Sequence, residues 1–105
     1  MYEKDVAEDM ALKGAQDLIR TYGWLQGKTG SRDVGYCISG ALNVAMWKYD
    51  RQVCEKVYSR VRRLVKGEGS NGLASYNDAP RRTKQEVLDL LERARLAAMA
   101  DACKP

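Results

Sequence analysis

The sequence predicts an all-α domain, or a mainly α domain with at most a short hairpin, built as a compact four-helix bundle. Apolar residues recur at helical spacing in four separate segments of the 105-residue chain. Glycine-rich or polar turn sequences separate these segments. The chain is long enough to bury one core but too short for two. We therefore expect a single helical domain over residues 1–105, with an ordered core at about residues 5–100.

The first helix is expected from Val6 to Tyr22, where apolar side chains return at every third or fourth position. Gly23 then supplies a stop. Residues 23–35 contain four glycines, so this segment is expected to turn tightly, as an irregular hairpin at most. Trp24 is too large to leave in water and should hold the segment against the core.

The second helix is expected over residues 36–49, where the small Gly40–Ala41 pair would let another helix approach closely. Asp50 can cap a third helix, which Gly67 ends. The apolar stripe of the third helix, which should face inward, consists of Val53, Val57, Val61, Leu64 and Val65.

Residues 66–77 are rich in glycine and serine and are expected to form a loop, which leads to a polar turn at residues 76–80. Thr83 and Glu86 have the spacing of a capping box, in which a hydroxyl and a carboxylate each close one main-chain amide. The last helix should therefore start after Thr83 and end near Ala102.

The sequence contains none of the residue patterns of a familiar active site. The chain has no histidine, which is the commonest general base near neutral pH and the commonest metal ligand. There is no phosphate-binding loop and no Cys-x-x-Cys pair. The pair Glu8–Asp9 is assigned to a solvent-exposed face of the first helix. We expect a non-enzymatic protein with no catalytic residue, no metal and no cofactor.

The three cysteines are interpreted as buried, reduced thiols: Cys37, Cys54 and Cys103. Cys37 lies near a predicted helix start, which can activate a thiol, but no partner base is identifiable. No segment approaches the ~20 apolar residues that span a bilayer, and the first residues are acidic, unlike a secretory signal. The sequence therefore predicts a cytoplasmic protein without a membrane partner, and it leaves the oligomeric state open.

The net charge of +4 is unevenly spread, because residues 48–66 carry seven bases against two acids. The basic face of the third helix consists of Arg51, Lys56, Arg60, Arg63 and Lys66. Such a face could follow a phosphate backbone, so nucleic-acid binding is one alternative function. A solvated face explains the same pattern, and no helix-turn-helix signature or exposed aromatic series accompanies it.

A second candidate surface combines polar and aromatic residues of two loops: Trp24, Gln26, Tyr76, Asn77, Asp78, Arg81 and Arg82. Loops held by a rigid scaffold often carry function. A pocket between these loops could hold a small ligand, with Arg81 or Arg82 against an anionic group. The same residues also suit a purely structural role, since Asn77 and Asp78 favour turns.

Three motifs together resemble a small domain of unknown function found in actinobacteria and their phages: Gly23-Trp24-Leu25-Gln26-Gly27, the segment from Gly35 to Leu42, and the segment from Tyr76 to Thr83 followed by Glu86-Val87. The resemblance spans about residues 10–98. Members usually carry cysteine, tryptophan and glycine where this chain has Leu25, Tyr76 and Arg81, which puts an essential role for that cysteine in doubt.

The resemblance implies a compact domain of phage or bacterial origin, in which the turn at Asn77 packs against the helix start at Cys37. It implies no activity. From the residues, we expect a non-catalytic binding protein whose partner is a protein, such as a phage accessory product that engages a host protein. Sequestration of a small ligand and binding of nucleic acid by the third helix are the alternatives.

Overall fold

The computed structural model describes residues 2–103, with side chains from Val6 onward. Most of this part of the chain is helical, as the sequence predicts, but it contains five helices rather than four, together with one very small antiparallel sheet. In chain order the elements are α1 (Tyr2–Tyr22), β1 (Gly30–Ser31), β2 (Gly35–Tyr36), α2 (Ile38–Met46), α3 (Arg51–Gly67), α4 (Leu73–Asn77) and α5 (Lys84–Ala102).

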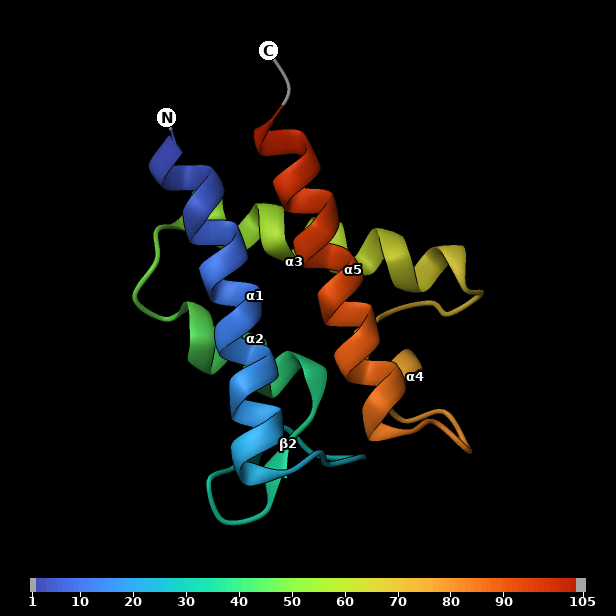
Figure 1. Ribbon diagram of the computed structural model, residues 1–105. Helices are drawn as coiled ribbons and strands as arrows, with labels where there is room; N and C mark the ends of the chain where they lie inside the picture. The colour runs from blue at the N-terminus through green and yellow to red at the C-terminus, as the bar shows by residue number, and fades with distance from the viewer. Residues whose placement is uncertain (1, 104–105) are drawn as a thin grey trace.

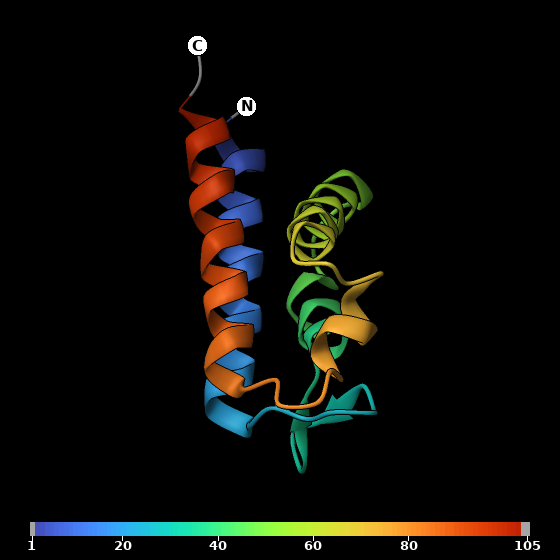
Figure 2. The same ribbon diagram turned by 90° about the vertical axis from the view of Figure 1, so that its right-hand side faces the viewer.

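The helices form two layers (Figures 1 and 2). The long helices α1 and α5 lie side by side and run in opposite directions, so the first turn of α1 is next to the last turn of α5. The shorter helices α2, α3 and α4 make the second layer, with α3 crossing behind the α1–α5 pair. None of the helices in residues 2–103 combines the length and the apolar composition that crossing a lipid bilayer requires.

The core lies between these layers and takes its side chains from α1, α2, α3, α4 and α5. Four of the five residues in the predicted stripe of α3 are fully buried, and Leu64 packs against them. Helical periodicity would also place Met10 and Leu96 in the core, but both side chains are more than half exposed. Met10 instead lies at the edge of the contact between α1 and α2.

The helix ends follow local chemistry and confirm several predictions. Gly23 ends α1 with a positive φ of 105°, a conformation that glycine adopts without strain. Asp50 caps α3, accepting a hydrogen bond from the amide of Val53. Thr83 and Glu86 form the predicted capping box at the start of α5. The second helix is shorter than predicted, because Gly35–Tyr36 pairs with Gly30–Ser31 instead of entering the helix.

The prediction that residues 66–77 form a loop is wrong for the last part of that segment. Leu73–Asn77 is a short helix, α4, although the segment that leads into it is rich in glycine and serine. Leu73 and Tyr76 are three residues apart, so one helical turn brings both side chains onto the same face. Both are buried in the core. Burial against α2 and α3 therefore stabilises a helix that local propensity does not predict.

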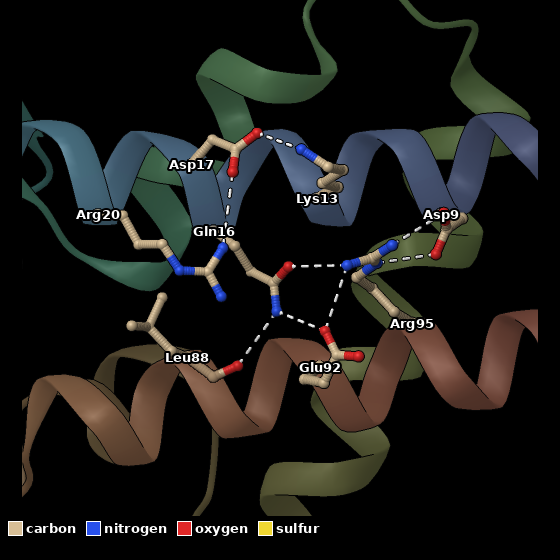
Figure 3. A network of polar contacts seen from close by, with 8 residues as sticks. All are labelled: Asp9, Lys13, Gln16, Asp17, Arg20, Leu88, Glu92 and Arg95. Carbon is tan, nitrogen blue, oxygen red and sulfur yellow. Dashed lines mark hydrogen bonds and ion pairs between the residues drawn. The ribbon is translucent and has the colours of Figure 1, made fainter.

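A network of polar side chains joins α1 to α5 (Figure 3). The amide nitrogen of the fully buried Gln16 donates to the main-chain oxygen of Leu88 at 3.3 Å and to Glu92 at 3.0 Å. Its amide oxygen accepts from Arg95 at 3.3 Å, and Arg95 also pairs with Asp9 at 2.9 Å. Every polar atom of the Gln16 side chain thus has a partner, which removes the cost of its burial.

Gly40 permits a close approach, but the neighbour is a loop rather than the helix expected from the sequence. A Cβ added at Gly40 would lie 2.0 Å from the main-chain oxygen of Thr29. The close contact of α2 with another helix lies at Gly14 of α1. A Cβ added at Gly14 would be 3.3 Å from the Cβ of Ala45. The loop before β1 is therefore pressed directly onto the first turn of α2.

Gly40→Ala is expected to lower the free energy of unfolding by about 2 kcal/mol, because the new methyl overlaps a main-chain oxygen that no side-chain rotation can move. The matched control is Gly67→Ala, whose methyl would meet nothing within 4 Å. Alanine is the better helix former by about 1 kcal/mol, so this variant should be as stable as the wild type or more so. Urea unfolding of both variants checks this, and equal stabilities would contradict the close approach at Gly40.

Candidate functional site

The three sequence motifs meet at one end of the molecule, around the side chain of Asn77. Asn77 is the last residue of α4 and is 1% exposed. Its Oδ1 accepts hydrogen bonds from Trp24 Nε1 at 2.8 Å and from the amide of Ile38 at 3.1 Å. Its Nδ2 donates to the main-chain oxygen of Leu25 and to Asp78, both at 2.9 Å. Asn77 thereby fastens the loop after α1 and the first turn of α2 to the end of α4.

Gln26 and Asp78 strengthen the same connection from the solvent side. Gln26 Nε2 donates to the main-chain oxygens of Asn77 and Ala79, at 3.0 and 3.1 Å. Asp78 accepts a hydrogen bond from the amide of Gly27 at 2.8 Å. We call the set Trp24–Gly27, Cys37–Ile38 and Asn77–Ala79 the motif junction. The proximity of the Asn77 turn to the start of the second helix, implied by the family resemblance, is present in the structure.

A hollow of about 270 Å³ opens beside the motif junction. Its lining residues are Gly27, Lys28, Thr29, Cys37, Ser39, Leu73, Ala74, Asn77 and Asp78. The site offers a thiol, two hydroxyls, an amine and a carboxylate around a partly apolar floor, so its chemistry suits a small polar molecule. Within residues 2–103, no group of three or more potential metal-ligating side chains comes together.

A family model for a family of unknown function, DUF6197, matches residues 1–97 of the chain. The chain belongs to this family. No curated protein and no solved structure matches it. Since the match covers almost the whole sequence, the motif junction is a feature of a DUF6197 domain and not of an added segment.

The two candidate arginines of this DUF6197 chain are placed differently. The guanidinium of Arg82 stacks 3.6 Å above the Tyr76 ring, donates to the main-chain oxygen of Tyr76 and pairs with Glu86. Arg81 is exposed and has no hydrogen bond or ion pair to any other described residue. Its φ of 69° lies in the left-handed region, which favours glycine over residues that carry a side chain. Of the two, Arg81 is the one available to an anionic ligand.

The thiols of this DUF6197 chain are less buried than expected. Cys103 is exposed, and Cys37 and Cys54 are only half-buried, so the interpretation as buried thiols is wrong for Cys103. Cys37 caps α2, because its sulfur accepts a hydrogen bond from the amide of Gly40 at 3.3 Å. Sequence reasoning missed this role because cysteine is not among the preferred capping residues.

Asp78 links the stability of the motif junction to pH. Hydrogen bonds from Asn77 and then from the amide of Gly27 lower the pKa of this carboxyl below its ordinary value. A depressed pKa in the folded state contributes stability above the unfolded-state pKa of about 3.9, and that contribution is lost as the pH falls through the folded-state pKa.

Asp78→Ala is therefore expected to lower the melting temperature at neutral pH, and the difference from the wild type should shrink as the pH falls through the lowered folded-state pKa. The effect should be modest, because Asp78 is exposed and water screens its interactions. Thermal unfolding of the wild type and the variant at several pH values provides the measurement. If the wild type and Asp78→Ala differed equally in melting temperature at neutral pH and at the lowest pH, the two hydrogen bonds would not stabilise the ionised carboxyl specifically.

The basic face of α3 is weaker than the sequence predicts, because Arg60 is turned inward. Its guanidinium is 14% exposed and pairs with Glu8 at 3.1 Å and with Asp101 at 2.7 Å. Burial lowers the pKa of Arg60, but the hydrogen bonds to Asp101 and Glu8 outweigh it and raise the pKa overall. The assignment of Glu8 to a solvent face is wrong, since Glu8 is 3% exposed beneath this arginine.

The other members of the predicted basic face remain at the surface. Arg51 pairs with Glu55 at 3.3 Å. Lys56, Arg63 and Lys66 are exposed and have no ion pair with another described residue. Three unpaired cations along one helix are ordinary for a solvated surface.

A further surface, around Trp47, was not among the candidate sites predicted from the sequence. Trp47, directly after α2, is 81% exposed, and Met10 and Val44 near it are also exposed. These three side chains help to line a groove of about 400 Å³ between α1 and α2. We call it the α1–α2 groove; its other lining residues are Gly14, Asp17, Leu18, Thr21, Tyr22, Ala45, Lys48 and Tyr49. The helical pattern gave no signal, because apolar spacing alone does not distinguish a second surface from the core.

Proposed function

We propose that this DUF6197 chain is a non-catalytic binding protein that engages a protein partner through the α1–α2 groove. The observation that carries the proposal is the side chain of Trp47, which is 81% exposed at the edge of a groove lined by other apolar residues. Tryptophan is among the residues most enriched at the energetic centres of protein interfaces. A large exposed apolar side chain beside further apolar surface is typical of an interaction site.

The surroundings of Trp47 support this proposal. Trp47 stands between the α1–α2 groove and a second hollow of about 220 Å³, lined by Asn43, Met46, Tyr49, Cys54 and Tyr58 as well as by Trp47 itself. A partner that packs against Trp47 could therefore contact both hollows. The helices beneath are rigidly placed, since Gly14 and Ala45 hold α1 and α2 in close contact. A preorganised surface of this kind loses little conformational entropy on binding.

The experiment is an affinity pull-down from bacterial lysate, treated with nuclease and washed at high salt, that compares the wild type with Trp47→Ala and Leu96→Ala. Leu96 is 61% exposed on α5, outside the groove, and so provides a matched loss of exposed apolar surface. We expect a protein partner that is recovered in stoichiometric amounts with the wild type and with Leu96→Ala. Trp47→Ala should not retain it. Retention by all three proteins, or by none, would contradict a binding site at the groove.

The biological setting belongs to the same proposal. We take the chain to be a cytoplasmic accessory product of a phage, and its partner to be a protein of the bacterial host. The support is indirect: the sequence motifs resemble domains from actinobacteria and their phages, and the exposed apolar surface suits a protein partner. Neither catalysis nor a cofactor enters this function.

The hollow beside the motif junction favours a second candidate function, the retention of a small ligand. It joins a hydroxyl, a thiol and the amine of Lys28 to an apolar floor, and Arg81 lies unpaired on the nearby turn. Native mass spectrometry of protein isolated from its bacterial host tests this. A retained molecule that is lost in Ala74→Phe, which fills the hollow, would support the candidate; a native mass equal to that of the bare polypeptide for both proteins would remove it.

A further inference from the structure

We infer that the partner of the α1–α2 groove is an acidic amphipathic segment, which places apolar side chains against Trp47 and carboxylates over the rim. The inference rests on the proposed function and deepens it, because it names the chemistry of the partner. Two features of the groove carry it: an apolar interior and a rim on which positive charge is in excess.

The interior of the groove supplies the apolar half of this chemistry. Leu18 and Ala45 line it between the two helices, while Val44 and Trp47 project at its edge. No polar side chain among residues 6–103 that is shielded from water lacks a hydrogen-bond partner. The groove thus presents no buried polar atom that a partner would have to satisfy, and aliphatic side chains match it best.

The charged residues around the rim of the groove favour an acidic partner. Of the residues that line the groove, Asp17 is the one acid, and it is already paired with Lys13 at 2.8 Å and with Arg20 at 3.6 Å. Lys48 adds a further cation on the opposite side, where its ammonium lies 5.6 Å from the centre of the Tyr49 ring. Lys13 and Arg20 flank the groove beside Asp17, and Lys48 lines it on the other side, so three cations accompany one carboxylate here. A partner with acidic residues would neutralise the excess charge and associate faster.

The same charges argue against two other occupants. A second copy of the chain that docked through this groove would bring the two positively charged rims together, which is unfavourable. A nucleic acid would find one exposed aromatic ring but no series of rings on which successive bases could stack. The unpaired cations of α3, which could contact phosphates, do not line this groove.

The test uses two labelled peptides of about 14 residues, roughly four helical turns. Both carry leucine at the same positions of one helical face, and the remaining positions are glutamate in one peptide and lysine in the other. A labelled single-stranded oligothymidylate is the third probe. Fluorescence anisotropy measures the binding of each probe to the wild type, Trp47→Ala, Lys48→Glu, Lys66→Glu and Leu96→Ala.

We expect the glutamate peptide to bind at least tenfold more tightly than the lysine peptide. Trp47→Ala should weaken its binding roughly thirtyfold, as for an interface hot spot, and Lys48→Glu roughly fivefold. Lys66→Glu makes the same charge change at an exposed position of α3 away from the groove. It should leave the affinity nearly unchanged, and so should Leu96→Ala.

Four outcomes would overturn the inference: a lysine peptide that binds as tightly as the glutamate peptide, equal effects of Lys48→Glu and Lys66→Glu, no binding of either peptide, or Trp47-dependent binding of the oligothymidylate in preference to both. The pull-down distinguishes a failure of this inference from a failure of the proposed function. A Trp47-dependent partner that contacts the groove through a basic or uncharged segment would preserve the function and remove only the acidic chemistry.

Discussion

Asn77→Ala is expected to lower the free energy of unfolding by about 3 kcal/mol or more, because one substitution leaves several polar groups of the motif junction without partners. The indole N–H of Trp24, the amide of Ile38 and the main-chain oxygen of Leu25 all bond to the Asn77 side chain. A shielded polar group that loses its partner costs about 1–3 kcal/mol. Urea unfolding followed by circular dichroism provides the measurement.

Two further variants test whether this loss of stability comes from the hydrogen bonds of Asn77. Asn71→Ala removes the same side chain at an exposed position of the loop before α4 and should change stability by less than about 0.5 kcal/mol. Asn77→Asp keeps an oxygen toward Trp24 and Ile38 but replaces the donor that faces Leu25 and Asp78 with a second acceptor. It should therefore be nearly as unstable as the alanine variant. If Asn77→Asp had wild-type stability, the donated hydrogen bonds would be unimportant.

Arg60→Met is expected to lower the free energy of unfolding by about 3 kcal/mol, because it leaves the Glu8 carboxylate buried without its cation. Glu8 is 3% exposed, and Arg60 spans it and Asp101. Removal of one member of a buried ion pair is usually far more costly than replacement of both by apolar residues. The double variant Glu8→Leu with Arg60→Met should therefore recover much of the stability that the single variant loses.

An exposed ion pair of the same helix provides the control. Arg51 and Glu55 pair on α3 with both side chains largely in water, so Arg51→Met should cost less than about 1 kcal/mol. Chemical denaturation of the wild type, Glu8→Leu, Arg60→Met and the double variant completes a double-mutant cycle. A double variant whose loss equals the sum of the two single losses would show that Glu8 and Arg60 contribute independently and that the buried pair is not coupled.

The parts of the fold that depend on local sequence were predictable. Asp50, Thr83 and Glu86 act on amides a few residues away, and the valines of α3 repeat along one helix, so these signals can be read from neighbouring positions. α4 was missed because its stability comes from the burial of Tyr76 among residues distant in the sequence. The length of α2 was overestimated for a similar reason, since Tyr36 pairs across the hairpin.

The same distinction applies to the sites. The proximity of Asn77 to the start of α2 followed from the family resemblance, and the candidate residues Trp24, Gln26 and Asp78 do meet there. The exposure of Trp47 and the inward turn of Arg60 could not be predicted, because each depends on how α1 packs against α2 and α3. The local sequence around a charged or aromatic residue is the same whether its side chain is exposed to water or packed against another helix.

The motif junction also has a consequence for the rates of folding and unfolding. Asn77 bonds to Ile38 and Trp24, which are 39 and 53 positions away along the chain. These bonds form only after the hairpin, α2 and α4 have come together, which places them late on the folding path. Interactions absent from the transition state slow unfolding without speeding folding. We therefore expect Asn77→Ala to raise the rate of unfolding more than it lowers the rate of folding.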